Sequence, residues 1–192
     1  MEKFTQIFKD LWAVVKADWK SALIVALYIW LFLFVVLLPF IPILGWPWIF
    51  ATPLFCAALG MASTLVCGNA VKFGGIIAPF KVKNYYWKAL LLNLFMVITA
   101  PLYTIGIGYR WAFAPYILAE NPELSFGEVL KKSAALTNGH KLPLWLSVLA
   151  IIVATVITSV LIWWIPVVNI AVGILVTAVP YLFVAKYYNS VK

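Results

Sequence analysis

Few side chains in this sequence could bind a charged ligand or move a proton, and Arg110 is the first of them. It interrupts an apolar stretch, 89–119, and precedes Glu120 by ten residues, which is about 15 Å along a helix. If this stretch lies in a membrane, a charge at that depth is energetically expensive and commonly marks a functional site. We expect Arg110 to meet carbonyls near Gly106 and Gly108, a lipid phosphate or an anionic substrate. The plainer alternative is an arginine that reaches the membrane surface or clamps a broken helix.

Four polar side chains beyond this stretch are further candidates for a ligand site. Glu120 and Glu123 could form an acid–base pair, although the same run, with Asn121 and Pro122, also suits an ordinary turn before a helix. His140, the single histidine, suits the negative end of a helix dipole better than catalysis.

Asn93 lies inside the apolar stretch and needs a hydrogen-bond partner there, so we expect it to join helices or line a polar path. One histidine and two cysteines in an apolar tract, Cys56 and Cys67, cannot supply a zinc site with the usual ligands. The sequence also lacks a nucleotide-binding glycine loop and a Gly-x-Ser-x-Gly motif. We therefore expect no metal, no cofactor and no catalytic residue. The candidate ligand-binding residues are Arg110, Glu120, Asn121, Glu123, His140 and Asn93.

Composition indicates that the whole chain is one integral membrane domain, 1–192. Hydrophobic residues make up 66% and charged residues 10%, whereas soluble domains carry about 25% charged residues. The net charge is +8, but the lysines flank apolar tracts, where they set topology and contact anionic lipid. We expect membrane lipids as partners and no nucleic acid.

Three apolar tracts predict the membrane-spanning helices. The tracts 21–71 and 142–185 contain no charged residue, and each is long enough for two spans of about 20 residues. The stretch 89–119 is interrupted by Pro101, Gly106 and Gly108. It fits either a single span, 89–109, or a compressed and broken hairpin.

Two amphipathic segments predict helices that lie on the membrane surface. Apolar residues recur at helical spacing in 4–19 and, more weakly, in 125–138. Ser125 and Glu128 form a capping box at the start of the second segment, and Asn138 and Gly139 suit its end.

The distribution of lysines favours six spans over five, because six leave both termini, the loop 72–88 and the segment 120–141 in the cytoplasm. The basic residues expected to face lipid are Lys72, Lys81, Lys83, Lys88, Lys131, Lys132 and Lys141.

Three runs resemble a family: 105–111 (IGIGYRW), 114–122 (APYILAENP) and 139–141 (GHK). They are similar to the signature of the bacterial integral membrane family called domain of unknown function 975. The chain departs from that signature with Ile105 where proline is usual and Glu120 where aspartate is usual. The resemblance implies a compact multi-pass helical bundle in the bacterial cell membrane, and it implies no established activity.

These features favour a non-enzymatic accessory or scaffold subunit that holds anionic lipid, a membrane protein partner or a second copy of itself. The alternative is a small transporter, channel or lipid-handling protein with its site around Arg110, because interrupted helices often line substrate sites. A membrane enzyme that modifies lipid through Glu120, Glu123 and His140 is a third hypothesis.

Overall fold

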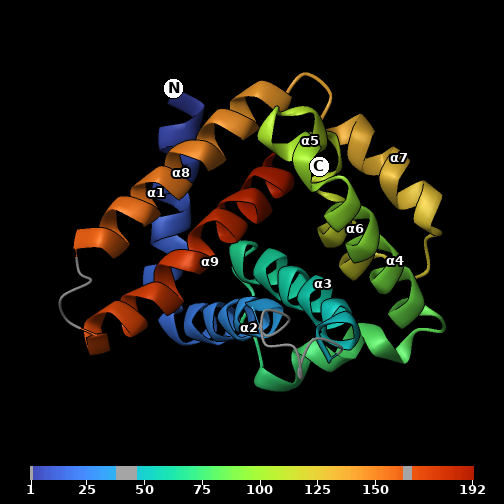
Figure 1. Cartoon of the computed structure of the whole chain (residues 1–192), viewed down its shortest axis with the longest axis horizontal. Coiled ribbons are helices and arrows are strands. Elements are labelled where there is room, and N and C mark those ends of the chain that lie inside the picture. Colours follow the sequence, from blue (N-terminus) through green and yellow to red (C-terminus); the bar gives the residue numbers. More distant parts are fainter. Residues whose placement is uncertain (1, 38–46, 162–165) are drawn as a thin grey trace.

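The computed structural model describes residues 2–37, 47–161 and 166–192, and every regular element in these ranges is helical (Figure 1). The all-helical prediction is confirmed for this part of the chain. The tight turns expected within the two uncharged tracts, at 46–48 and 163–166, lie largely outside the described residues, which resume at Pro47 and Pro166 as the first residues of helices. In chain order the elements are α1 (Glu2–Ala17), α2 (Trp19–Leu37), α3 (Pro47–Val66), the 3-10 helix η2 (Phe73–Lys81), α4 (Tyr85–Ile98), α5 (Ala100–Thr104), the 3-10 helix η3 (Ile107–Trp111), α6 (Ala114–Glu120), α7 (Phe126–Leu136), α8 (Lys141–Leu161) and α9 (Pro166–Val191).

Helix α1 is the amphipathic helix expected at 4–19, and it packs against α9, α2 and α3. Ile7 and Leu11 are buried, whereas Phe8 and Trp12 on the same predicted face stay exposed. Part of the apolar face therefore lies against the protein, and the rest is available to an apolar surrounding.

Helix α3 ends at Val66, five residues before the end of the apolar tract 21–71, where the second span was expected to end. Gly68 has a φ of +82°, and its N–H donates to the Leu65 carbonyl, while the Asn69 N–H donates to the Thr64 carbonyl. This pair of bonds with a left-handed glycine is a Schellman motif, which stops a helix by satisfying its last carbonyls.

The stretch 89–119 is not one continuous helix, as its proline and glycines indicate. Whether it crosses a membrane once or as a hairpin stays a prediction. Helix α4 begins inside the predicted loop 72–88 and ends at Ile98, and α5, η3 and α6 follow as separate short helices. Gly106 adopts a φ of +82° between α5 and η3. A Cβ atom on Gly108 would overlap the Tyr103 ring, so only glycine allows this fold-back.

The amphipathic helix expected at 125–138 is α7, and its predicted capping box is confirmed. Its C-cap is Thr137, two residues before Gly139. The Ser125 hydroxyl accepts from the Glu128 N–H, and the Glu128 carboxylate accepts from the Ser125 N–H at 2.8 Å. Gly139 takes a left-handed φ of +79° just beyond the helix. Helices α4 and α6 pack beside α7 (Figure 1).

Among the described residues, one segment, Lys141–Thr158 in α8, is long and apolar enough to cross a membrane. Only 17% of that segment is buried inside the protein, and its surface is rich in leucine, isoleucine and valine. Shorter apolar stretches occur at Trp19–Phe32, Pro53–Val66 and Tyr85–Ile98. Helix α9 lies beside α8 (Figure 1) and continues to Val191, beyond the predicted limit of 185.

Helix α3 is the centre of the packing, since it contacts α2, α4, α6 and α9. Its closest approach is to α6, where a Cβ atom built on Gly60 would stand 2.5 Å from the Ala119 Cβ. Small residues let helices approach this closely and gain dispersion contacts along their length.

We predict that Gly60→Ala destabilises the protein by about 1–3 kcal/mol, because the added methyl group overpacks the contact between α3 and α6. Thermal unfolding in mild detergent should give a midpoint lower by roughly 2–4 °C for each kcal/mol. Gly173→Ala is the matched control, since a Cβ there meets nothing within 4 Å and alanine has the higher helix propensity. An unchanged midpoint for Gly60→Ala would contradict the close contact.

Candidate functional site

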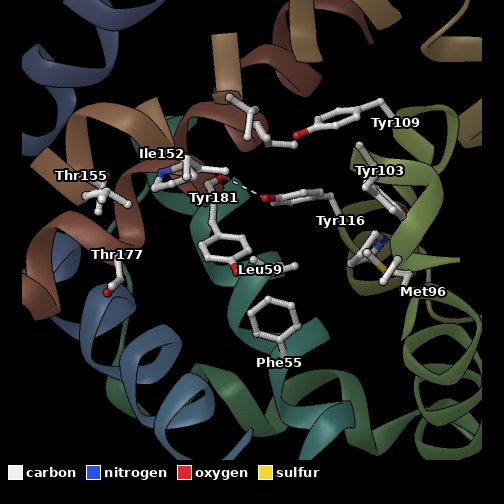
Figure 2. Close-up of a pocket in the computed structure, with 17 residues that line it drawn as sticks. Phe55, Leu59, Met96, Tyr103, Tyr109, Tyr116, Ile152, Thr155, Thr177 and Tyr181 are labelled. Carbon is white, nitrogen blue, oxygen red and sulfur yellow. Dashed lines mark hydrogen bonds between the residues drawn. The ribbon is translucent and has the colours of Figure 1, made fainter. Parts of the chain in front are cut away.

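The strongest candidate site is an apolar cavity of about 440 Å³ beside the broken segment (Figure 2). Side chains from α3, α4, α5, η3, α6, α8 and α9 line it. Its size falls within the range of cavities that hold small ligands, about 300–1,000 Å³. The cavity adjoins the break in 89–119, since Ala100 and Tyr103 of α5 and Tyr109 of η3 help to line it.

The cavity opens on the surface between α5 and α8. Ala100, Ile152 and Val156 line it and are also exposed, the two α8 residues by 44% and 56%. Neighbouring side chains on this surface, Val97 and Ile98, are apolar and exposed as well. The opening therefore leads to an apolar surface.

Three of the six side chains with a hydroxyl group that line the cavity, Tyr116, Thr155 and Thr177, have hydrogen-bond partners. The Tyr116 hydroxyl donates to the Tyr181 carbonyl at 2.8 Å (Figure 2). Thr155 and Thr177 donate to carbonyls one turn earlier in their own helices, at 2.9 and 2.7 Å. With these hydroxyls paired, the walls present mainly hydrocarbon and ring faces to any occupant.

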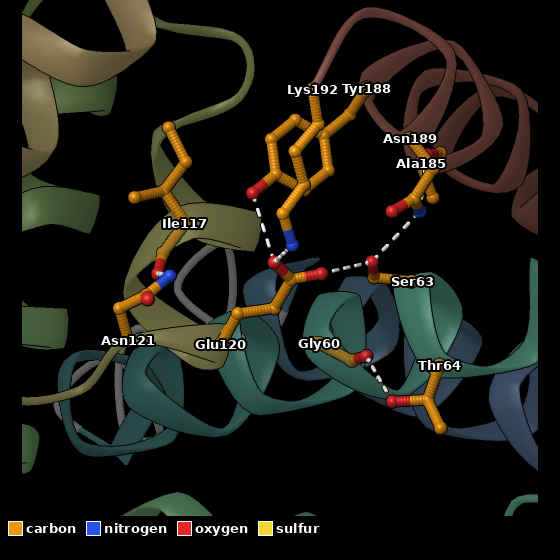
Figure 3. Close-up of polar contacts among 10 residues, drawn as sticks. All are labelled: Gly60, Ser63, Thr64, Ile117, Glu120, Asn121, Ala185, Tyr188, Asn189 and Lys192. Atoms are coloured by element: carbon orange, nitrogen blue, oxygen red, sulfur yellow. Dashed lines mark hydrogen bonds and ion pairs between the residues drawn. The ribbon is translucent and has the colours of Figure 1, made fainter. Parts of the chain in front are cut away.

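Glu120 lies at the centre of a second, polar cluster, which joins α3, α6 and α9 (Figure 3). Its Oε1 accepts from the Ser63 hydroxyl at 2.6 Å, and its Oε2 accepts from the Tyr188 hydroxyl at 2.9 Å and from Lys192 Nζ at 2.6 Å. The Asn189 amide in turn donates to Ser63 Oγ at 3.0 Å. Each carboxylate oxygen is satisfied, which is typical of a structural junction.

The electrostatics of this cluster keep Glu120 ionised. Burial raises the pKa of the Glu120 carboxyl, but the bonds from Lys192, Ser63 and Tyr188 and the charge of Lys192 more than offset it, so the pKa lies below its ordinary value. The Glu120 carboxyl is therefore not poised to exchange a proton near neutral pH.

Arg110 is exposed. It is not among the residues that line the cavity. Its guanidinium lies 5.5 Å from the centre of the Trp111 ring. The backbone carbonyl of Arg110 accepts hydrogen bonds from the Ser133 and Thr137 hydroxyls of α7, at 3.0 and 3.1 Å. The sequence pattern gave no indication of this contact. The premise of one straight helix from Arg110 to Glu120 is wrong, because η3 ends at Trp111 and α6 begins at Ala114. The depth of Arg110 in a membrane stays a prediction.

The remaining candidate residues do not converge on one site. His140 Nδ1 lies 3.4 Å from the Tyr187 hydroxyl, whereas Glu120 bonds to Tyr188. The Asn121 amide donates to the Ile117 carbonyl at 3.2 Å, and Glu123 is exposed. The proximity of Glu120 and Glu123 in the sequence thus leads to no carboxylate pair.

Asn93 is buried and joins two helices, α4 and α3, which is the first of the two roles expected for it. Its amide donates to Cys56 Sγ at 3.1 Å and to the Ala89 carbonyl at 2.8 Å. Cys67, in contrast, is exposed beyond the end of α3, although both cysteines belong to the apolar tract 21–71.

Most of the lysines expected to face lipid are exposed: Lys72, Lys81, Lys83, Lys131 and Lys132. Lys141 is half-buried, and Lys88 is partly buried because its Nζ donates to the Pro122 and Glu123 carbonyls at 2.9 and 3.0 Å. Lys88 therefore fixes the start of α4 to the turn before α7. Tyr85, at the start of α4, is fully buried.

Sequence reasoning missed the tyrosines of the cavity, Tyr103, Tyr109, Tyr116 and Tyr181. Their helical spacing resembles that of ordinary core residues, so no local pattern marks them. The one available signal was indirect, because the cavity adjoins the interruption at Pro101, Gly106 and Gly108.

No protein-family model matches this chain, and no curated protein or solved structure matches it either. Among the described residues, no group of three or more His, Cys, Asp or Glu side chains is arranged to hold a metal ion. The resemblance to domain of unknown function 975 stays a prediction.

We predict that the stability supplied by Glu120 is present at neutral pH and declines in acid. Because the folded pKa lies below the ordinary value, the contribution is complete above the ordinary pKa of about 4.3 and is lost as the pH falls through the folded pKa. At pH 7, Glu120→Gln should lower the thermal midpoint by about 2–4 °C for each kcal/mol lost. The gap from the unmodified protein should narrow toward pH 3.

Glu123→Gln is the control for this pH series, since Glu123 is exposed. It should leave the midpoint unchanged throughout. A Glu120→Gln gap that stays constant in acid would mean that the carboxylate charge contributes nothing.

Proposed function

We propose that this chain is an integral membrane protein that binds a lipid chain in the cavity beside its broken segment. The observation that carries the proposal is the lateral opening, where Ala100, Ile152 and Val156 connect the cavity to an exposed apolar surface. A hydrocarbon chain in the bilayer could enter there without crossing water. The exposed apolar faces of α4 and α8 could contact either lipid or a partner helix. They therefore do not distinguish an accessory subunit from a lipid-binding protein.

Helix lengths support a membrane location for four helices. Besides α8, the helices α2, α3 and α9 have 19, 20 and 26 residues, or about 29, 30 and 39 Å. The hydrocarbon core of a bilayer is about 30 Å thick. Each of the four is long enough to cross it.

The broken segment is better explained as re-entrant than as two further spans. Helix α6 has 7 residues, or about 10 Å, too short to cross. Helix α4 has 14 residues, or about 21 Å, and is interrupted at Thr99 before α5. Lys88 bonds to the turn at 122–123, and α7 bonds to the Arg110 carbonyl.

The middle of the segment also returns to the same side, because Gly106 lies against Trp145 in the second turn of α8. We therefore favour four crossing helices over the six inferred from the sequence. Both arrangements leave the termini and the lysine-rich segments on one side, which the lysines identify as cytoplasmic.

We predict that Val156→Trp greatly reduces the lipid that copurifies with the protein, because an indole at the opening obstructs entry. Val160→Trp is the matched control: Val160 lies one turn further along α8, is 65% exposed and does not line the cavity. Native mass spectrometry should detect a lipid adduct in the unmodified protein and in Val160→Trp, at least tenfold more than in Val156→Trp. The proposal would be refuted if both variants carried equal amounts of the lipid adduct, or if the unmodified protein carried none. A second protein bound in stoichiometric amount in place of lipid would favour an accessory subunit.

The predicted orientation can be tested through Cys67, which is exposed, with Cys56 buried as an internal control. A membrane-impermeant maleimide should label Cys67 in inside-out vesicles and leave right-side-out vesicles unlabelled. Cys67→Ser should abolish the labelling and Cys56→Ser should preserve it. Labelling from the outer side alone would reverse the orientation.

A further inference from the structure

The 3-10 helix η2, which connects α3 to α4 (Figure 1), turns back alongside α2. Just before η2, the Val71 N–H donates to the Ser21 hydroxyl at 2.9 Å, so Val71 lies level with the first turn of α2. The Phe73 carbonyl accepts from the Tyr28 hydroxyl at 2.8 Å, and the two rings lie 5.1 Å apart. Tyr28 follows Ser21 by seven residues, or about 10 Å along a helix. Phe73 therefore lies further along α2 than Val71 does.

Part of η2 holds it to the protein, and part is apolar and exposed. Ile76 is buried, and the Phe80 ring packs edge-on against the ring of the buried Tyr85, with 5.1 Å between the centroids. Phe73 and Ile77, in contrast, are 62% and 59% exposed. Large apolar side chains that are held in place and grouped on a surface commonly mark a contact with a membrane or a partner.

Three lysines flank these apolar side chains. Lys72, Lys81 and Lys83 are exposed, and none has an ion-pair or hydrogen-bond partner in the part of the chain that the structure describes. Lys88 differs from them, because its Nζ is bonded to the turn before α7. The surface of η2 thus combines unpaired positive charge with exposed hydrocarbon.

The acidic residues of the chain leave this charge uncompensated. The sequence contains no acidic residue between Asp18 and Glu120. Asp18 comes close to η2 through Ser21, but its carboxylate accepts from the Ser21 N–H and hydroxyl at 3.1 and 2.6 Å. Glu120 is bonded to Lys192. Negative charge for the lysines of η2 must therefore come from a partner.

We propose that η2 carries a binding surface for anionic phospholipid of the cytoplasmic leaflet. This η2 surface consists of Lys72, Phe73, Ile77, Lys81 and Lys83. The two apolar side chains insert among the acyl chains, and the lysine ammonium groups pair with phosphate groups at the membrane surface. An acidic soluble protein would account for the lysines, but it would leave apolar side chains at the depth of Tyr28 without a suitable surrounding.

This inference rests on the membrane location proposed above and is independent of the cavity. It replaces the general expectation that seven lysines face lipid with one defined surface, from which Lys88 is excluded because it is engaged within the protein. A lysine near an anionic membrane contributes roughly a fivefold gain in affinity. Three such lysines should therefore give a clear preference for anionic over zwitterionic lipid.

The test places a fluorophore on η2 and measures its quenching by spin-labelled lipid. The full-length protein carries Cys67→Ser and Ala78→Cys, since Ala78 is an exposed residue of η2 and Cys56 is buried. Phosphatidylcholine vesicles contain spin-labelled phosphatidylglycerol or phosphatidylcholine with the label at the same position. Phosphatidylglycerol should quench at a mole fraction at least tenfold lower, and added salt should reduce this preference. Equal quenching by the two lipids would overturn the proposal.

Two pairs of substitutions assign the preference to η2. Lys81→Gln combined with Lys83→Gln should reduce it at least fivefold. Lys131→Gln combined with Lys132→Gln is the matched control, because it removes two exposed lysines from α7. The control should retain the full preference. A preference that survives the first pair, or that both pairs reduce equally, would contradict a site on η2.

Insertion of the apolar side chains is tested with acrylamide, a quencher dissolved in water. The fluorophore at position 78 should be protected from acrylamide in vesicles, and Ile77→Asp should remove this protection. Because Ile77 is 59% exposed, the substitution should leave the thermal midpoint unchanged. Full access of acrylamide to the unmodified surface would overturn insertion and would favour a soluble partner.

This proposal and the proposed function fail in different ways. Val156→Trp should leave the lipid preference at η2 unchanged, because it alters only the opening of the cavity on α8. A preference at η2 without a lipid adduct that depends on Val156 would retain the η2 surface and overturn the lipid cavity. An adduct that Val156→Trp abolishes, in a protein whose η2 shows no preference, would overturn the η2 surface alone.

Discussion

The contact between α3 and α6 is the constraint on which the rest of this structure depends. Gly60 and Ala119 let the two backbones approach, and this brings Glu120, the next residue of α6, beside Ser63 one turn further along α3. From there Glu120 binds Tyr188 and Lys192, so one small-residue contact and one carboxylate join three helices. In an apolar surrounding, where burial of hydrocarbon distinguishes poorly between alternative packings, close fit and paired polar groups are the interactions that choose one.

The cavity is a consequence of how the chain reaches that contact. After α4 the backbone breaks, turns through Gly106 and folds back along α7, where two hydroxyls bind a carbonyl that a continuous helix would have satisfied itself. Short helices cannot cover the faces of α8 and α9 as a full-length helix would. The space left beside them is lined by tyrosines, whose rings are wide enough to bound it and whose polar ends need partners.

The sequence predicted the features that depend on neighbouring residues. The capping box at Ser125 and Glu128, the left-handed Gly139 and the interruption of 89–119 are local, and all are found. The end of α3 was also open to prediction, because Gly68 marks it. What the sequence could not reveal depends on distant pairs: Glu120 meets Lys192 across 72 positions. The distance between Arg110 and Glu120 was misjudged because ten residues measure about 15 Å only if they form one straight helix, and here they belong to two, η3 and α6.

The sideways opening at Ala100 and Val156 has a consequence for how occupancy would be regulated. A site that exchanges its ligand within the plane of a bilayer responds to the mole fraction of that ligand among its neighbours, and the concentration in water has little direct influence. Residence time would then depend on the packing of the surrounding chains, and thus on their unsaturation and on temperature. Such a protein would report the composition of the membrane that encloses it.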